Sequence, residues 1–143
     1  MATTAKPKGR LMGSRTYAAV LPVEFSQFLL FDHFSELNPG DIPRHDGPVH
    51  CGAGGVRFIA HDQSIRVSVR LAVGPVVDGD VAGTFTAPSG RVMLCATTAS
   101  PNDVVVDLGR PGRYALHATR VADVVLGEHY RTESWDLAVW AAE

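Results

Sequence analysis

Hydrophobic and polar residues alternate along much of this chain, and the alternation is most regular in residues 65–73. Isoleucine, valine and leucine occupy the odd-numbered positions of that segment, whereas arginine, serine and alanine occupy the even-numbered ones. A period of two is typical of a β-strand that buries one face. Shorter apolar segments bounded by turn-forming residues predict eight further strands. These are residues 17–25, 27–31, 56–61, 81–87, 91–97, 104–108, 113–121 and 134–141.

A succession of eight or nine short strands predicts an all-β fold, an antiparallel β-sandwich. Three of the connections, at residues 62–64, 88–90 and 109–112, are as short as β-hairpin loops. We therefore expect each of them to join two strands that pair antiparallel in one sheet. The sequence contains no internal repeat and no linker-like segment, so residues 16–143 are expected to form a single domain.

The composition is that of a soluble globular protein. Of the 143 residues, 45% are hydrophobic and 20% are charged. No apolar run reaches the roughly 20 residues that span a bilayer. Residues 1–15 lack the apolar segment of a signal peptide and are expected to form a disordered basic tail, which makes the cytoplasm the expected location. Cys51 and Cys95 are too few for a disulfide framework, so we expect both thiols to be free.

The charge is distributed unevenly along the chain. Four cations and no acid lie in residues 1–15, whereas residues 16–143 carry nine arginines and fifteen acids, a net charge of −6. An acidic body argues against direct nucleic-acid binding, which requires a basic face. It favours a protein partner with a basic surface. The use of arginine in place of lysine outside the tail, with much alanine, valine and glycine, is associated with bacterial genes of high GC content.

Residues 32–55 form the longest predicted loop, because prolines and glycines interrupt any regular element beyond a helical turn near residues 35–37. Long loops in compact domains are often functional, so this loop is a candidate ligand site. Two sets of residues are of metal-binding types. The zinc set is His45, Asp46, His50 and Cys51, and the calcium set is Asp32, Asp41, Asp46, Asp78 and Asp80.

Neither set has the spacing of a known metal motif. The six histidines never stand two or four residues apart, and the pair Asp78 and Asp80 lacks the further acids of an EF-hand. The sequence also contains no nucleophile elbow, and no lysine follows the glycine-rich residues 52–55 as it would in a phosphate-binding loop. We therefore expect no catalysis and no cofactor, with a calcium- or small-ligand-binding loop as the alternative function.

The C-terminal segment offers a candidate surface for a protein partner. Trp135 alternates with apolar residues and is predicted to lie in the core, whereas Trp140 falls on the opposite face of the same strand. Exposed tryptophans are frequent anchors of interfaces, and acidic side chains around one suit a basic partner. The predicted partner-binding residues are Asp123, Glu128, Glu133, Asp136 and Trp140. A structural role, in which unpaired edge strands join copies of the chain, is a further alternative.

The segment Val-Glu-Phe-Ser-Gln-Phe-Leu-Leu-Phe-Asp, residues 23–32, resembles the opening of the competence protein J family. The likeness continues as a pattern through the glycine-rich loop, residues 56–73, the turn and strand at residues 112–116, and the last strand near Trp135. The middle loop lacks the acidic, tryptophan-containing character associated with the family.

The resemblance implies an all-β cytoplasmic protein that acts by binding another protein. The competence protein J family includes the inhibitor of a DNA-entry nuclease, so the resemblance implies an inhibitor or immunity-type function. It carries over no individual contact residue, because no motif of the family fixes one in this sequence.

Overall fold

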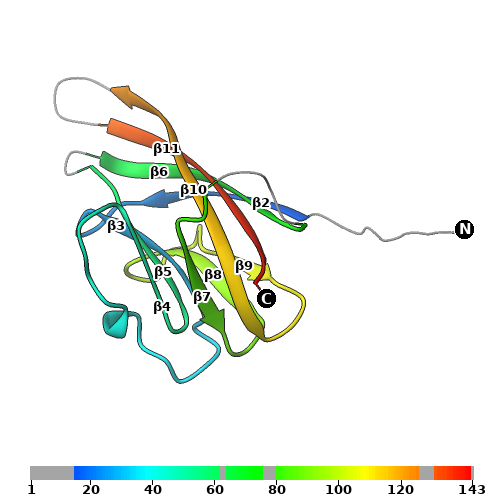
Figure 1. Ribbon diagram of the computed structural model, residues 1–143. Helices are drawn as coiled ribbons and strands as arrows, with labels where there is room; N and C mark the ends of the chain where they lie inside the picture. The colour runs from blue at the N-terminus through cyan, green and yellow to red at the C-terminus, as the bar shows by residue number, and fades with distance from the viewer. Residues whose placement is uncertain (1–14, 62–63, 76–79, 126–130, 143) are drawn as a thin grey trace, which may run out of the picture.

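The chain folds into two five-stranded β-sheets that face each other (Figure 1). The computed structural model describes residues 15–61, 64–75, 80–125 and 131–142, with the backbone alone for 122–125 and 131. From edge to edge, the first sheet comprises β2 (Arg15–Pro22), β6 (Ser64–Val73), β11 (Arg131–Ala141), β10 (Gly112–Val125) and β7 (Gly83–Ala87). The second comprises β4 (Val49–Gly52), β5 (Gly55–Ile59), β3 (Gln27–Phe31), β8 (Arg91–Ala96) and β9 (Val104–Asp107).

This arrangement confirms the predicted all-β sandwich. Neighbouring strands pair antiparallel except β6 and β11, which run parallel. Because side chains alternate between the two faces of a strand, the odd-numbered residues 67, 69 and 71 of β6 point into the space between the sheets, whereas Ile65, which the sequence also marked as buried, is 40% exposed. Val67, Val69 and Leu71 are fully buried there. In the described part of the chain, no helix is long and apolar enough to cross a membrane.

Three aromatic rings form the centre of the core. The rings of Phe28 and Phe58 stack with centroids 4.7 Å apart, and these residues are paired across β3 and β5. Trp135, on β11 of the opposite sheet, meets both rings edge-on at 5.4 and 5.7 Å. Trp135 is 2% exposed, which confirms its predicted place in the core. Edge-to-face contacts of this kind stabilise a core beyond the apolar area that they bury.

All three predicted hairpins are wrong, because each short connection crosses from one sheet to the other. The connection at residues 62–64 joins β5 of the second sheet to β6 of the first, and the turn at 88–90 joins β7 of the first to β8 of the second. The turn at 109–112 leads from β9 back to β10. The consecutive strands that do pair with each other are instead β4 with β5, β8 with β9, and β10 with β11.

The segment predicted as one long loop, residues 32–55, covers the outer face of the second sheet. It contains the short 3-10 helix η1 (Pro39–Asp41) and the strand β4, so the expectation of a single helical turn at residues 35–37 is wrong. Ile42 packs with Leu29, Phe31 and Cys95 in a small second core. Arg57, 2% exposed, donates to the carbonyl oxygens of Ile42 and Pro39 and thereby holds the segment against the sheet.

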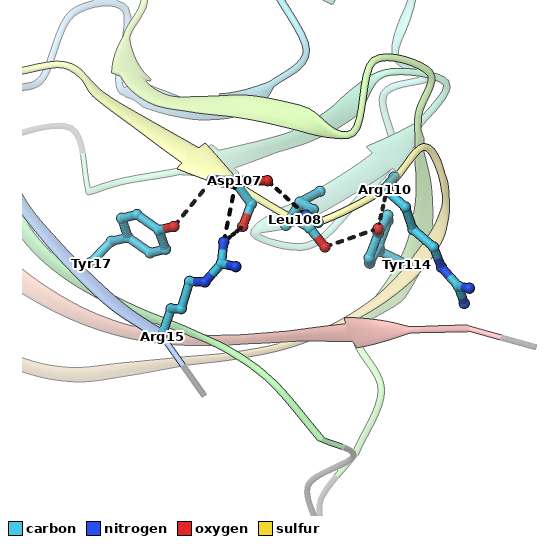
Figure 2. Close-up of polar contacts among 7 residues, drawn as sticks. Arg15, Tyr17, Asp107, Leu108, Arg110 and Tyr114 are labelled. Carbon is cyan, nitrogen blue, oxygen red and sulfur yellow. Dashed lines mark hydrogen bonds and ion pairs between the residues drawn. The ribbon is translucent and has the colours of Figure 1, made fainter. Parts of the chain in front are cut away.

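Hydrogen bonds join the two sheets along both sides of the sandwich. On one side the Gly54 amide donates to the Thr86 carbonyl at 2.9 Å, next to a parallel bridge between Ala53 and Thr86. On the other side the edge strands β2 and β9 meet through side chains (Figure 2): Tyr17 accepts from the Asp107 amide at 3.2 Å. Arg15, which the sequence placed in the tail, is the first residue of β2 and forms an ion pair with Asp107 at 3.3 Å.

Candidate functional site

Glu133, one of the predicted partner-binding acids, has a fully buried side chain. It lies on the core face of β11, two residues before Trp135, and the alternation of residues 133, 135, 137 and 139 already carried that signal. Its Oε2 accepts from the His61 amide and the Ser64 hydroxyl, both at 2.5 Å. Its Oε1 accepts from the Trp135 indole at 3.0 Å. The carboxylate therefore joins the end of β5, the start of β6 and the core tryptophan.

The surroundings of Glu133 keep it ionised although it is buried. Burial raises the pKa of this carboxyl, but the hydrogen bonds from Ser64, His61 and Trp135 and the charge of Arg120 lower it further than burial raises it. The pKa of Glu133 consequently lies below its ordinary value. Arg120, half-exposed at the surface, approaches Oε1 to 3.7 Å. Glu133 is a structural anchor of the β10–β11 hairpin and does not present its charge at the surface.

The other predicted acids are distributed along this hairpin. Asp123 is paired with Glu133 in the ladder between β10 and β11, and Glu128 lies outside the described residues. Asp136 is exposed on the outer face of the first sheet, where its carboxylate lies 3.6 Å from the Arg70 guanidinium. The structure thus places Asp123 near the end of β10, where β11 begins beside it, and Asp136 further along β11.

Trp140 lies near the opposite end of β11 from Glu133, four positions beyond Asp136. It stands seven positions after Glu133, a distance of about 23 Å along an extended strand. Its side chain is 7% exposed and lines a pocket of about 190 Å³. Arg15, Arg110 and Asp107 line the same pocket, so its lining carries charges of both signs and is not an acidic patch. Of the five predicted residues, those that the structure describes therefore do not gather into one patch.

Tyr114 and Asp107 form the polar wall of that pocket (Figure 2). The Tyr114 hydroxyl donates back to the carbonyl oxygens of Arg110 at 2.5 Å and Leu108 at 3.3 Å. Such a bond from a tyrosine to the backbone a few residues upstream fixes a connection between sheets in many sandwiches. These side chains are engaged in holding the fold, and among them the structure describes no group free to perform chemistry.

In the described part of the chain, the members of the metal-binding sets predicted in and near residues 32–55 do not come together. Asp32 is fully buried, and its carboxylate accepts from the Phe34 amide and from both the amide and the hydroxyl of Ser89. Asp41, Asp46 and Asp80 are exposed, and Asp78 lies outside the described residues. His50 is engaged by the Gly47 carbonyl and by Arg57. Among the residues that the structure describes, no three histidines, cysteines or acids converge on a possible ion.

The two cysteines are free thiols on opposite faces of the second sheet. Cys51 packs against the main core, whereas Cys95 belongs to the small second core on the other face. Burial raises the pKa of the Cys51 thiol to about 11. Burial and the charge of Asp103 raise that of Cys95 to about 12. Neither thiol is a candidate nucleophile, because the thiolate is the reactive form.

A turn at Phe25 was missed by the sequence pattern, because the alternation predicted that the first strand continues to that residue. The strand β2 ends at Pro22, and residues Phe25 and Ser26 form a tight turn before β3. Both have positive φ, 58° and 56°, and Glu24 and Gln27 are bridged on either side. A left-handed conformation costs about 1–2 kcal/mol for each such residue. The Phe25 side chain is 79% exposed, which alternation alone could not reveal.

The turn adjoins a hollow of about 410 Å³ at the same end of the sandwich. The Val23 amide donates to the Ile65 carbonyl at 3.0 Å, which ties the base of the turn to one wall of the hollow. Val20 and Ile65 line it and are 48% and 40% exposed. Residues Ser100, Pro101 and Asn102 form the other wall. The surface of this end is therefore apolar at Phe25, Val20 and Ile65. We call these three residues, together with Glu24 and residues 100–102, the tip surface.

Comparisons with known proteins give one informative likeness. No protein-family profile and no curated protein matches the chain. A solved structure, that of ComJ, inhibitor of the DNA degrading activity of NucA, from Bacillus subtilis, superposes with a TM-score of 0.60. The match covers 90% of this chain and 98% of ComJ at 13% sequence identity. It shows a shared fold, and it confirms the resemblance to the competence protein J family at that level.

Proposed function

We propose that this chain is a non-catalytic protein that binds and inhibits a nuclease. The observation that carries the proposal is the common fold with ComJ, which extends over 90% of this chain and 98% of the inhibitor. Identity of 13% means that surface residues differ almost throughout, so the nuclease bound by this chain is expected to differ from NucA.

Charge supports a partner of this class. Nucleases bind phosphate through basic clefts, and residues 16–143 of this chain carry a net charge of −6. Opposite charges steer two proteins together and raise the rate of association, an effect that salt weakens. We assign the steering contacts to Asp123, Glu128 and Asp136 of the β10–β11 hairpin. In this proposal Glu133 acts indirectly, because it fixes the hairpin to the core. Trp140 likewise acts indirectly, at the far end of β11.

The test is inhibition of DNA degradation. The purified full-length chain is added to an extract of its source cells, and cleavage of linear double-stranded DNA is followed at low and at high salt. The proposal predicts inhibition that saturates at one chain per nuclease and weakens as salt rises. If an excess of the chain leaves DNA degradation unchanged at both salt concentrations, the proposed function is wrong.

A charge-reversal pair tests the assigned contacts. The variant Asp123→Lys/Glu128→Lys is expected to inhibit about tenfold more weakly at low salt, since rim charges act mainly on the association rate. The control, Asp41→Lys/Asp46→Lys, changes the net charge equally at two exposed residues of the segment 32–55. Equal loss of inhibition in both variants would contradict the assignment to the hairpin and leave only a general effect of net charge.

A further inference from the structure

The turn at Phe25 and Ser26 is strained at both of its central residues. Two consecutive positive φ values between bridged residues are the arrangement of a type I′ turn, in which asparagine and glycine are the usual residues. Phenylalanine and serine carry a Cβ that this conformation disfavours. Strained backbone persists only where the surroundings determine it, and such positions cluster at functional sites.

Neighbouring segments hold the turn from several directions. The Glu24 carboxylate accepts from the amide and the hydroxyl of Thr98, and the Glu24 carbonyl accepts from the Thr97 hydroxyl. On the other side the Ala60 amide donates to the Ser26 carbonyl at 2.8 Å. The turn is therefore fixed by the loop after β8 and by the end of β5. A side chain displayed on a fixed turn loses little conformational entropy when it binds.

Packing in the core does not explain the strained conformation of Phe25. A residue forced into an unfavourable conformation for the sake of the core would be buried, whereas the Phe25 ring is 79% exposed, more than any other large hydrophobic side chain described. The segments around it, residues 22–27 and 96–104, carry Glu24 and Asp103 and contain no lysine or arginine. The tip surface thus combines a protruding aromatic ring with the carboxylate of Glu24, and Arg66 lines the hollow beside it.

We propose that Phe25 is the anchor by which the chain docks on its partner, its ring entering an apolar pocket whose rim is cationic. Buried aromatic anchors surrounded by complementary charge carry most of the binding energy of many interfaces. The hollow beside the turn, lined by Val20 and Ile65, receives an apolar side chain of the partner in return. This inference rests on the proposed function and names the part of the inhibitor that fits the nuclease.

Two single variants distinguish the contribution of the Phe25 ring to binding from that of the turn conformation. Phe25→Asn and Ser26→Gly both place a residue that tolerates the left-handed conformation in a strained position, so each is expected to raise the melting temperature by a few degrees. Only Phe25→Asn removes the ring. In the DNA-degradation assay described above, Ser26→Gly is expected to inhibit like the unaltered chain, whereas Phe25→Asn requires at least a tenfold higher concentration for half-inhibition.

The outcomes distinguish this inference from the proposed function. Full inhibition by Phe25→Asn overturns the anchor and leaves the nuclease inhibitor standing. Weakened inhibition by both variants assigns the effect to turn geometry and also overturns the anchor. If the unaltered chain inhibits no nuclease, the proposed function and this inference fail together. Sedimentation of the free chain adds a further check, because dissociation of an oligomer by Phe25→Asn would assign the ring to contacts between copies and overturn docking on a nuclease.

Discussion

At the scale of single residues, burial decides which acids hold the fold and which can meet a partner. Glu133 and Asp32 are both fully buried, and each accepts three or more hydrogen bonds that connect separate strands or loops. Buried carboxylates are tolerated only when they are satisfied in this way. The sequence predicted Glu133 as a surface acid, although its position in the alternation placed it with Trp135 on the core face.

Removal of the Glu133 carboxylate is expected to destabilise the protein strongly. Glu133→Ala leaves the His61 amide, the Ser64 hydroxyl and the Trp135 indole without their acceptor, a loss of about 3 kcal/mol in the free energy of unfolding. The control is Asp136→Ala, an exposed acid three residues further along β11, which should change it by less than about 0.5 kcal/mol. Urea denaturation measures both. Equal effects of the two variants would contradict the structural role of Glu133.

The lowered pKa of Glu133 predicts a pH dependence of stability. Because the folded pKa lies below the unfolded one, the stabilisation is complete above the ordinary value of 4.5 and is lost as the pH falls through the folded pKa. Glu133→Gln cannot titrate, so its free energy of unfolding should fall less steeply with acid below that value. Denaturation curves of both proteins at several pH values test this. Parallel declines would show that other groups account for the acid sensitivity.

The buried thiols should react slowly in the native state. With pKa values of about 11 and about 12, Cys51 and Cys95 carry far less thiolate at pH 8 than a cysteine of ordinary pKa 9.0. Alkylation by iodoacetamide should therefore be at least about a hundredfold slower in the folded protein than in denaturant. Mass spectrometry of the labelled protein follows both rates. A native rate close to the denatured one would contradict the burial of these side chains.

At the scale of elements, the sequence predicted every described strand except β4, but not which strands pair. A period of two reports that one face is buried, and it is the same for a strand that turns back in its own sheet and for one that crosses to the other. The turns at residues 88–90 and 109–112 therefore predicted hairpins, whereas the structure uses them to change sheets. The parallel pair of β6 and β11 was equally hidden, since its partners lie far apart in sequence.

Two glycines test these crossings. Both have a left-handed φ, 79° at Gly90 and 94° at Gly109, but a Cβ at Gly90 would lie 2.7 Å from the backbone carbonyl carbon of Arg110. At Gly109 nothing lies within 4 Å. Gly109→Ala should lower the free energy of unfolding by about 1 kcal/mol, from backbone strain alone. Gly90→Ala should lower it by about 3 kcal/mol, because the added Cβ pushes the two crossing turns apart. Chemical denaturation compares them. Equal losses would mean that the turns do not pack as described.

At the scale of the whole molecule, the fold class followed from local patterns, whereas the candidate surface did not. Alternation and turn residues suffice for a sandwich, because each strand must bury one face. A surface depends on which ends of which strands meet. The acidic hairpin lost Glu133 to the core, Trp140 lies at the other end of β11, and the exposed Phe25 belongs to a turn that the sequence placed within a strand.

The proposed function, which rests on the fold shared with ComJ and on the acidic body, is that of a protein that occupies a basic partner. Its charge and its tip surface serve different parts of that task. Charge along the hairpin accelerates encounter and is screened by salt, whereas an aromatic anchor slows dissociation and is not. A higher salt concentration should consequently lower the rate at which the chain associates with its partner. It should change the rate at which the complex dissociates only a little.

Affinity capture with the tagged full-length chain tests the central claim most directly. The chain is incubated with a lysate of its source cells at low and high salt, and the retained proteins are identified and quantified by mass spectrometry. The account predicts one basic nuclease, retained in equal amount to the chain at low salt and reduced at high salt. Retention of no nuclease, or of a nuclease whose yield is the same at both salt concentrations, would contradict it.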